Sequence, residues 1–129
     1  MKESGRTLRV ADYLRDELAG IIRSGMRDPR VTMVTLNDVR VSKDLAYADI
    51  YVSSVLAEDT ASRESLIDAL NHASGYLRTS IARRSTMRTT PRLRFHYDRT
   101  EERGAELDAL IDRAVRADRR ARATTERDE

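Results

Sequence analysis

The sequence predicts a two-layer α+β domain in which helices cover one face of a three-stranded sheet. Apolar residues recur at three- and four-residue steps in several segments, which is typical of helices with one buried face. In other segments apolar and polar residues alternate, which is typical of half-buried strands. The order is helix, strand, strand, helix, a second helix after a bend, strand and helix, and this order favours an α+β architecture.

The composition limits the kind of protein. The chain has 129 residues, 36% of them charged, and no cysteine, so we expect neither disulfides nor a thiolate metal site. No stretch approaches the ~20 apolar residues of a membrane span, and the N-terminus has no apolar run of the signal-peptide type. We therefore expect a cytoplasmic monomer with a flexible N-terminus (residues 1–5), a folded domain (6–116) and a disordered charged tail (117–129).

Helices are expected near both ends of the domain. A first helix over residues 6–24 should end at Gly25, because glycine adopts the left-handed capping conformation freely. The pair Asp28-Pro29 should then prevent any further helix. A last helix is expected over residues 105–116, where apolar residues again share one face.

Three strands are expected between these helices. Strands over residues 32–41 and 46–55 have a short connection, which is typical of an antiparallel hairpin. Because the apolar parity changes within the first strand, we expect a bulge near Asn37-Asp38. A third strand begins at Pro91, and the long connection before it predicts a parallel crossover. Its alternation places Leu93, Phe95 and Tyr97 in the core and Arg92, Arg94 and His96 outside.

The middle of the chain predicts a bent helical segment. Thr60 or Ser62 can cap its start. Either one long helix contains Gly75, or two helices meet there at an angle, and the weak helix formers Ser74-Gly75 favour the bend. The apolar stripe that runs through it consists of Leu66, Leu70, Ala73, Leu77 and Ile81.

A long segment without carboxylates separates Asp68 from Asp98. Its 29 residues contain no Asp or Glu, although roughly five would be expected from 22 acids in 129 residues. The segment contributes +6 to a net charge of +2, so the rest of the chain sums to 2 − 6 = −4. We expect its cations to form one contiguous surface around the bend that attracts a polyanion. These cations are Arg78, Arg83, Arg84, Arg88, Arg92 and Arg94.

Several short motifs together resemble one bacterial family. The motifs are ASGYLR (73–78), PRLRFHYD (91–98), DPR (28–30) and VRVSKDLAYADIY (39–51). Together they resemble the ribosome-binding factor A proteins, and the likeness covers about residues 6–111. It implies a K-homology-like fold of type II, in the order α-β-β-α-kink-α-β, with a C-terminal helix. In place of the Gly-x-x-Gly loop of ordinary K-homology domains, the family has an interrupted Ala-x-Gly helix, which Ala73-Ser74-Gly75 matches.

The resemblance implies a non-enzymatic ribosome biogenesis factor. Such a protein binds the free small ribosomal subunit and its precursors through 16S ribosomal RNA, assists late maturation and supports growth in the cold. The six arginines are the expected RNA ligands, because guanidinium groups grip phosphate oxygens bidentately. We expect no cofactor and no metal, since no nucleophile–base pair, nucleotide-binding glycine loop or metal-ligand spacing is present.

Other interpretations of the same residues are open. The arginines could form a solvated cationic helix end, which the helix dipole favours by itself. The chain could also be a basic protein-interaction module of K-homology-like fold that does not act on RNA directly. A steep loss of binding to naked RNA with added salt would favour the RNA-binding interpretation. Tyr47 and Tyr51 could stack on bases, but we favour packing of that sheet face against the last helix.

Overall fold

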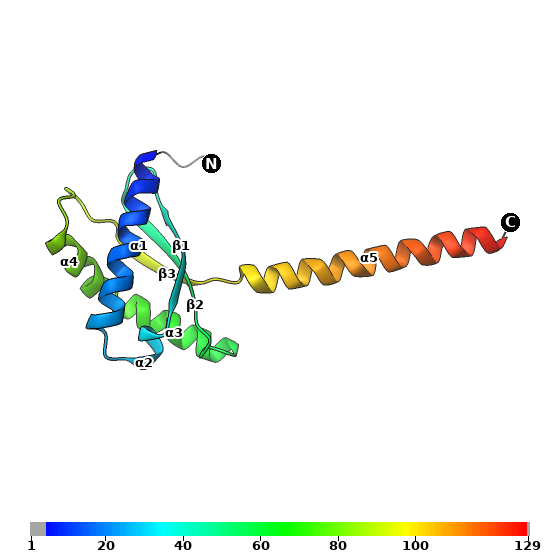
Figure 1. The fold of residues 1–129 in the computed structure, drawn as a ribbon, viewed down its shortest axis with the longest axis horizontal. Helices are drawn as coiled ribbons and strands as arrows, with labels where there is room; N and C mark the ends of the chain where they lie inside the picture. Colours follow the sequence, from blue (N-terminus) through cyan, green and yellow to red (C-terminus); the bar gives the residue numbers. More distant parts are fainter. Residues whose placement is uncertain (1–4, 129) are drawn as a thin grey trace. The chain divides into compact units, whose positions relative to one another are not determined.

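The computed structural model describes the backbone of residues 5–128 (Figure 1) and the side chains of residues 5–100 and 104–123. The chain divides into two units, with the boundary between Asp98 and Arg99. The flexible N-terminus expected over residues 1–5 lies outside the described residues, except that Gly5 begins the first helix. The elements in order are α1 (Gly5–Gly25), α2 (Pro29–Thr32), β1 (Thr35–Val41), β2 (Tyr47–Ser53), α3 (Thr60–His72), α4 (Ser74–Arg84), β3 (Arg92–Tyr97) and α5 (Thr100–Asp128).

The sheet has three strands in the order β1-β2-β3. β1 and β2 form an antiparallel hairpin, whereas β2 and β3 are parallel, so both predicted pairings are confirmed. Ile50 in the central strand pairs with Val39 of β1 and with Phe95 of β3. The register shifts between Leu36 and Asp38, which confirms the predicted bulge.

The core lies between one face of the sheet and the helices α1, α3 and α4, which gives the predicted two-layer α+β arrangement. Alternate residues of β2 and β3 are buried there, while their neighbours are exposed or half-buried on the other face. Each fully buried aliphatic or aromatic side chain stabilises the fold by ~1.5–3 kcal/mol relative to exposure. The core includes Leu14, Leu18, Ile50, Leu66, Leu70, Leu77, Ile81, Leu93 and Phe95.

The end of α1 differs from the prediction in two ways. Gly25 closes the helix without a positive φ, and glycine leaves room there for Tyr76, whose hydroxyl would lie 3.4 Å from an added Cβ. Asp28 and Pro29 begin the short helix α2 and do not prevent one. The Asp28 carboxylate caps it by accepting from the backbone N of Arg30 at 3.0 Å, and proline at the first position gives up no hydrogen bond.

The predicted bend is confirmed as a break of one residue between two helices. α3 ends at His72 and α4 begins at Ser74, with Ala73 between them. The cap of α3 is Asp59, which accepts from the backbone N of Ser62 at 2.7 Å, so neither Thr60 nor Ser62 is the cap. A β-region residue before the helix can aim its side chain at the third helical N–H, and Asp59 has that geometry.

The second unit is a single helix, α5, which is far longer than the predicted residues 105–116. The first compact unit ends at Asp98, while the domain boundary at residue 116 and the disorder of residues 117–129 stay predictions. The helix itself continues through Asp128. The physical reason is composition, because no proline or glycine follows Gly104 and alanine and arginine are strong helix formers. An ion pair of 3.3 Å between Asp118 and Arg122, one turn apart, adds support.

Candidate nucleic-acid interface

A positively charged groove lies between α4 and the loop that leads to β3. Its volume is about 470 Å³, and three of the six predicted arginines line it. None of the residues that line the groove carries a carboxylate. They all belong to the segment that lacks Asp and Glu in the sequence. Guanidinium and hydroxyl groups around one groove are donors for phosphate oxygens. The lining residues are Arg78, Thr79, Ala82, Arg83, Met87, Arg88, Thr89 and Thr90.

The groove has a fixed wall because α4 and the loop are hydrogen-bonded to each other. Arg78 Nε donates to the backbone oxygen of Thr90 at 3.0 Å. Thr90 is itself buried, and Met87 packs against the core, so these two residues anchor the loop. One N–H of Arg78 therefore holds the loop to α4, whereas the side chains of Arg83 and Arg88 are exposed.

The other three predicted arginines do not line this groove. Arg84 is directed toward α1, where its Nη1 lies 3.8 Å from Glu17 Oε2. Arg92 and Arg94 project from the face of β3 opposite the core. Both carboxylate oxygens of Asp49 hold Arg94, at 2.9 and 3.0 Å. The acids that the local sequence lacks are thus supplied by α1 and β2.

Asp49 joins two side chains of β3 on the open face of the sheet. Its Oδ1 also lies 2.8 Å from Nε2 of His96. Because a carboxylate only accepts hydrogen bonds, this nitrogen of His96 carries a proton. Burial raises the pKa of Asp49, but the hydrogen bonds from Arg94 and His96 outweigh it, so the pKa lies below its ordinary value. The hydrogen bond to Asp49 in turn raises the pKa of Arg94.

The predicted kink residues lie at the other end of α4 from Arg83. α4 has 11 residues, which corresponds to a length of about 16 Å. Ala73 and Ser74 are half-buried and Gly75 is exposed. No side chain caps the first turn of α4, and free N–H groups at a helix start favour an anion. The structure therefore separates the kink from most of the arginine groove.

Gly75 has an ordinary helical role in this fold. Its φ is not positive, and a Cβ at this position would meet no atom within 4 Å. The break in the helix lies two residues earlier, at Ala73. Neither backbone conformation nor crowding therefore requires glycine at residue 75.

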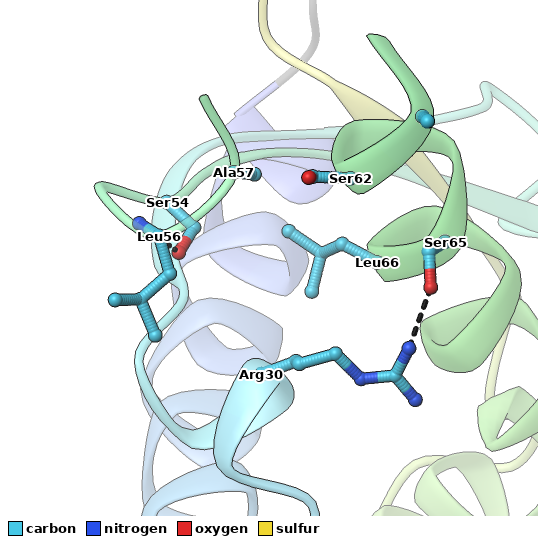
Figure 2. Close-up of a pocket in the computed structure, with 8 residues that line it drawn as sticks. Arg30, Ser54, Leu56, Ala57, Ser62, Ser65 and Leu66 are labelled. Carbon is cyan, nitrogen blue, oxygen red and sulfur yellow. Dashed lines mark hydrogen bonds between the residues drawn. The ribbon is translucent and has the colours of Figure 1, made fainter. Parts of the chain in front are cut away.

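A second depression, which the sequence did not predict, lies between α2, α3 and the β2–α3 loop. It has a volume of about 360 Å³. Figure 2 shows Arg30 extending from α2 toward Ser65 of α3, whose hydroxyl accepts from Arg30 Nη1. Arg30 is also paired with Asp28 at 2.7 Å, so its charge is balanced. Three separate segments build this pocket, which is why no local pattern indicates it. Its lining residues are Arg30, Ser54, Leu56, Ala57, Ala61, Ser62, Ser65 and Leu66.

The described residues offer no arrangement for a metal ion. No group of three or more His, Cys, Asp or Glu side chains among them is placed to hold one. His72 is exposed at the end of α3, and His96 is engaged with Asp49. Within the part of the chain that the structure describes, no helix has the length and apolar character to cross a membrane.

Comparison with known proteins decides the family. The sequence model of ribosome-binding factor A matches residues 6–111. The chain belongs to the ribosome-binding factor A family. The ribosome-binding factor A of Chromohalobacter salexigens is 49% identical over 119 residues, which cover 92% of this chain and 91% of that protein. The Pseudomonas paraeruginosa protein of the same name is 44% identical over 120 residues, covering 92% and 93%.

Solved structures of ribosome-binding factor A share the fold. The crystal structure of the Thermus thermophilus protein has a TM-score of 0.61 and 32% identity, and the match covers 70% of this chain and 94% of that one. A homology model of ribosome-binding factor A from the same organism was fitted into a cryo-electron microscopy map of its complex with the 30S subunit. Its TM-score is 0.55 at 35% identity, with 68% of this chain and 90% of that chain covered.

Proposed function

We propose that this member of the ribosome-binding factor A family binds the free small ribosomal subunit and its precursors through 16S ribosomal RNA. It assists late maturation and processing of that RNA, and supports growth in the cold. The observation that carries the proposal is the groove of Arg78, Arg83 and Arg88, which is free of carboxylates and lined with threonine hydroxyls. The related Thermus protein, fitted into a 30S complex, supports the choice of partner.

The groove suits the backbone of folded RNA. Folded RNA presents phosphates and 2′-hydroxyls over a broad surface and is recognised mostly by shape. The exposed guanidinium groups of Arg83 and Arg88 can each grip phosphate oxygens, while the threonine hydroxyls can donate or accept at the 2′-position. Arg84 and Arg94 are less effective phosphate ligands, because Glu17 and Asp49 already oppose their charges.

The mechanism requires no covalent chemistry and no cofactor. A protein that binds one arrangement of an RNA more tightly than another shifts the population toward the first. A preformed groove does this without a reaction step. We further propose that the factor acts as a cytoplasmic monomer, and that the kink residues Ala73, Ser74 and Gly75 and the exposed Arg92 lie near the bound RNA.

A paired charge reversal tests the groove. The variant Arg83→Glu/Arg88→Glu leaves the Arg78–Thr90 hydrogen bond in place. It should abolish co-sedimentation with small subunits while the circular dichroism spectrum stays unchanged. For protein-free 16S RNA, losing two phosphate contacts should reduce the slope of log K against log salt concentration by about 1.5.

The matched control is Arg116→Glu/Arg119→Glu, which changes the net charge equally on exposed positions of α5. It should keep most of the binding. If the groove variant binds subunits as well as the wild type, the groove is not the interface. If the wild type binds subunits but has no salt-dependent affinity for naked RNA, the chain is a protein-interaction module.

A further inference from the structure

The face of the sheet opposite the core carries rings and guanidinium groups. Along β2, Tyr47, Asp49 and Tyr51 alternate with the buried Ala48, Ile50 and Val52. On β3, the parallel register sets Arg92, Arg94 and His96 beside Tyr47, Asp49 and Tyr51 respectively. These positions of the two strands hold no aliphatic side chain.

Arg94 is held as a flat cationic surface. Its edge is fixed by two hydrogen bonds to Asp49, at 2.9 and 3.0 Å. Its guanidinium carbon lies over the Tyr47 ring, 4.3 Å from the ring centre, which is a cation–π contact. Its side chain is nevertheless 52% exposed. The Asp49 carboxylate already opposes the charge of this guanidinium, but the plane of the guanidinium is accessible. Such a group is better suited to stacking on a base than to binding a phosphate.

A second pair of rings lies farther along the same face. Tyr51 and His96 stack with 5.1 Å between ring centres and 27° between ring planes. The hydrogen bond of 2.8 Å between His96 and Asp49 fixes the imidazole. Asp49 thus orients a planar group on each side of itself. Tyr47 and Tyr51 are four residues apart on one strand, so the two platforms are about 13 Å apart.

The net charge of this face is weakly positive. It favours binding of a nucleic acid, but it is too small to make the face a strong phosphate-binding site. Arg40 stands beside Asp49 in the register of β1, and it pairs with Asp38 at 3.0 Å. Three arginines (40, 92 and 94) and two aspartates (38 and 49) give 3 − 2 = +1 with histidine neutral. A weakly positive, aromatic surface is the chemistry of single-strand binding, in which bases stack and the backbone is held by charge.

We propose that the open face of the sheet binds single-stranded RNA by stacking unpaired bases on the Tyr47–Arg94 and Tyr51–His96 pairs. This inference rests on the proposed function and adds a second contact of a different kind. The groove at α4 holds phosphates of folded RNA, and the sheet face takes bases of an unpaired segment. A factor with both contacts recognises RNA in which a single strand adjoins a folded region.

The test uses a labelled single-stranded octa-adenylate RNA and a blunt-ended RNA duplex of equal charge, with the full chain and fluorescence anisotropy. Tyr51→Leu removes a ring and keeps the charge. It should raise the Kd for octa-adenylate at least about fivefold, as expected for one lost stacking contact, without changing the salt slope. Arg94→Lys, which keeps the charge but loses the plane, should act in the same direction. Both variants should bind the duplex as the wild type does, because it has no unpaired bases.

Two further variants separate loss of stacking from loss of folding. Tyr51→Phe keeps the ring and should bind octa-adenylate within about twofold of the wild type, because stacking depends on the ring. Tyr76→Leu removes an exposed ring from α4, away from the sheet face, and should leave octa-adenylate binding unchanged. Circular dichroism and the Tm of each variant show whether the fold is intact.

The outcomes distinguish this inference from the proposed function. If octa-adenylate does not bind the wild type, or binds Tyr51→Leu and Arg94→Lys equally well, the stacking face is ruled out even where subunits still co-sediment. If Tyr51→Leu weakens subunit binding without affecting octa-adenylate, the face contacts a protein, which also overturns the inference. Failure of the wild type to co-sediment with small subunits would instead remove the proposed function.

Discussion

The side chain of Asn71 hydrogen-bonds to both backbone groups of Phe95. Its Oδ1 accepts from the Phe95 N–H at 2.9 Å, and its Nδ2 donates to the Phe95 carbonyl at 3.3 Å. β3 is an edge strand, so these two groups face away from β2 and have no neighbouring strand. Asn71 belongs to the last turn of α3 and therefore fixes the break before α4 to the sheet. An edge strand covered in this way is also protected from pairing with other chains.

Asn71→Leu should lower the free energy of unfolding by about 1–3 kcal/mol, because it leaves two partly buried backbone groups without partners. Chemical denaturation monitored by circular dichroism measures the change. The control His72→Ala alters the next residue, which is exposed, and should stay within about 0.5 kcal/mol of the wild type. Equal stability of the two variants would show that the amide contributes nothing to holding β3.

Gly75→Ala should raise the free energy of unfolding by up to ~1 kcal/mol, because alanine is the better helix former and the site is open. A higher Tm with subunit binding retained is the expected result. Gly20→Ala in α1, which is equally open, should give a similar gain. A lower Tm for Gly75→Ala alone would mean that the kink needs a backbone angle reserved for glycine.

Asp49 should make stability depend on pH in the acid range. Its pKa in the folded state lies below the ordinary value of 3.8, so its contribution is present above that value and is lost as pH falls through the folded pKa. Denaturation of the wild type and of Asp49→Asn from about pH 6 to about pH 2 should show two curves that approach each other as the pH falls. Parallel curves would contradict the role of Asp49.

Glu17→Gln should strengthen binding to 16S RNA several-fold, because it removes the carboxylate that opposes Arg84. The pair is separated by 3.8 Å and largely exposed on the arginine side, so the free energy of unfolding should change by less than about 1 kcal/mol. Asp16→Asn removes an exposed acid from the same helix and is the matched control. If both variants gain affinity equally, the effect is one of net charge and Arg84 is not involved.

Periodicity was sufficient to predict most of the fold. Alternation placed Leu93 and Phe95 in the core, and the change of parity in β1 predicted its bulge, because both patterns depend on neighbours along the chain. The helix that starts at Asp28-Pro29 was missed because the same pair that ends one helix can begin the next. The length of α5 was underestimated because residues 117–128 are polar and charged and have no apolar period to follow.

The candidate site could be predicted only in part. The absence of acids between residues 68 and 98 is matched by a groove at Arg83 and Arg88 whose lining residues carry no carboxylate. It could not show that Glu17 and Asp49, from other elements, approach Arg84 and Arg94. A stretch of sequence without acidic residues predicts an acid-free surface only where no other segment of the chain folds against it. The same limit hid the pairing of Tyr47 with Arg94, which depends on the parallel register.

The short junction between α3 and α4 limits how far α4 can move. It is one residue long, and helical backbone bonds bracket it, from Ala73 N to Ala69 O at 3.1 Å and from Leu77 N to Ala73 O at 3.0 Å. With Asn71 anchoring α3 and Leu77 in the core, α4 has little freedom to swing. If the groove binds RNA as proposed, the conformational entropy lost on docking would come mainly from the RNA, and RNA that already has the required backbone path would bind more tightly.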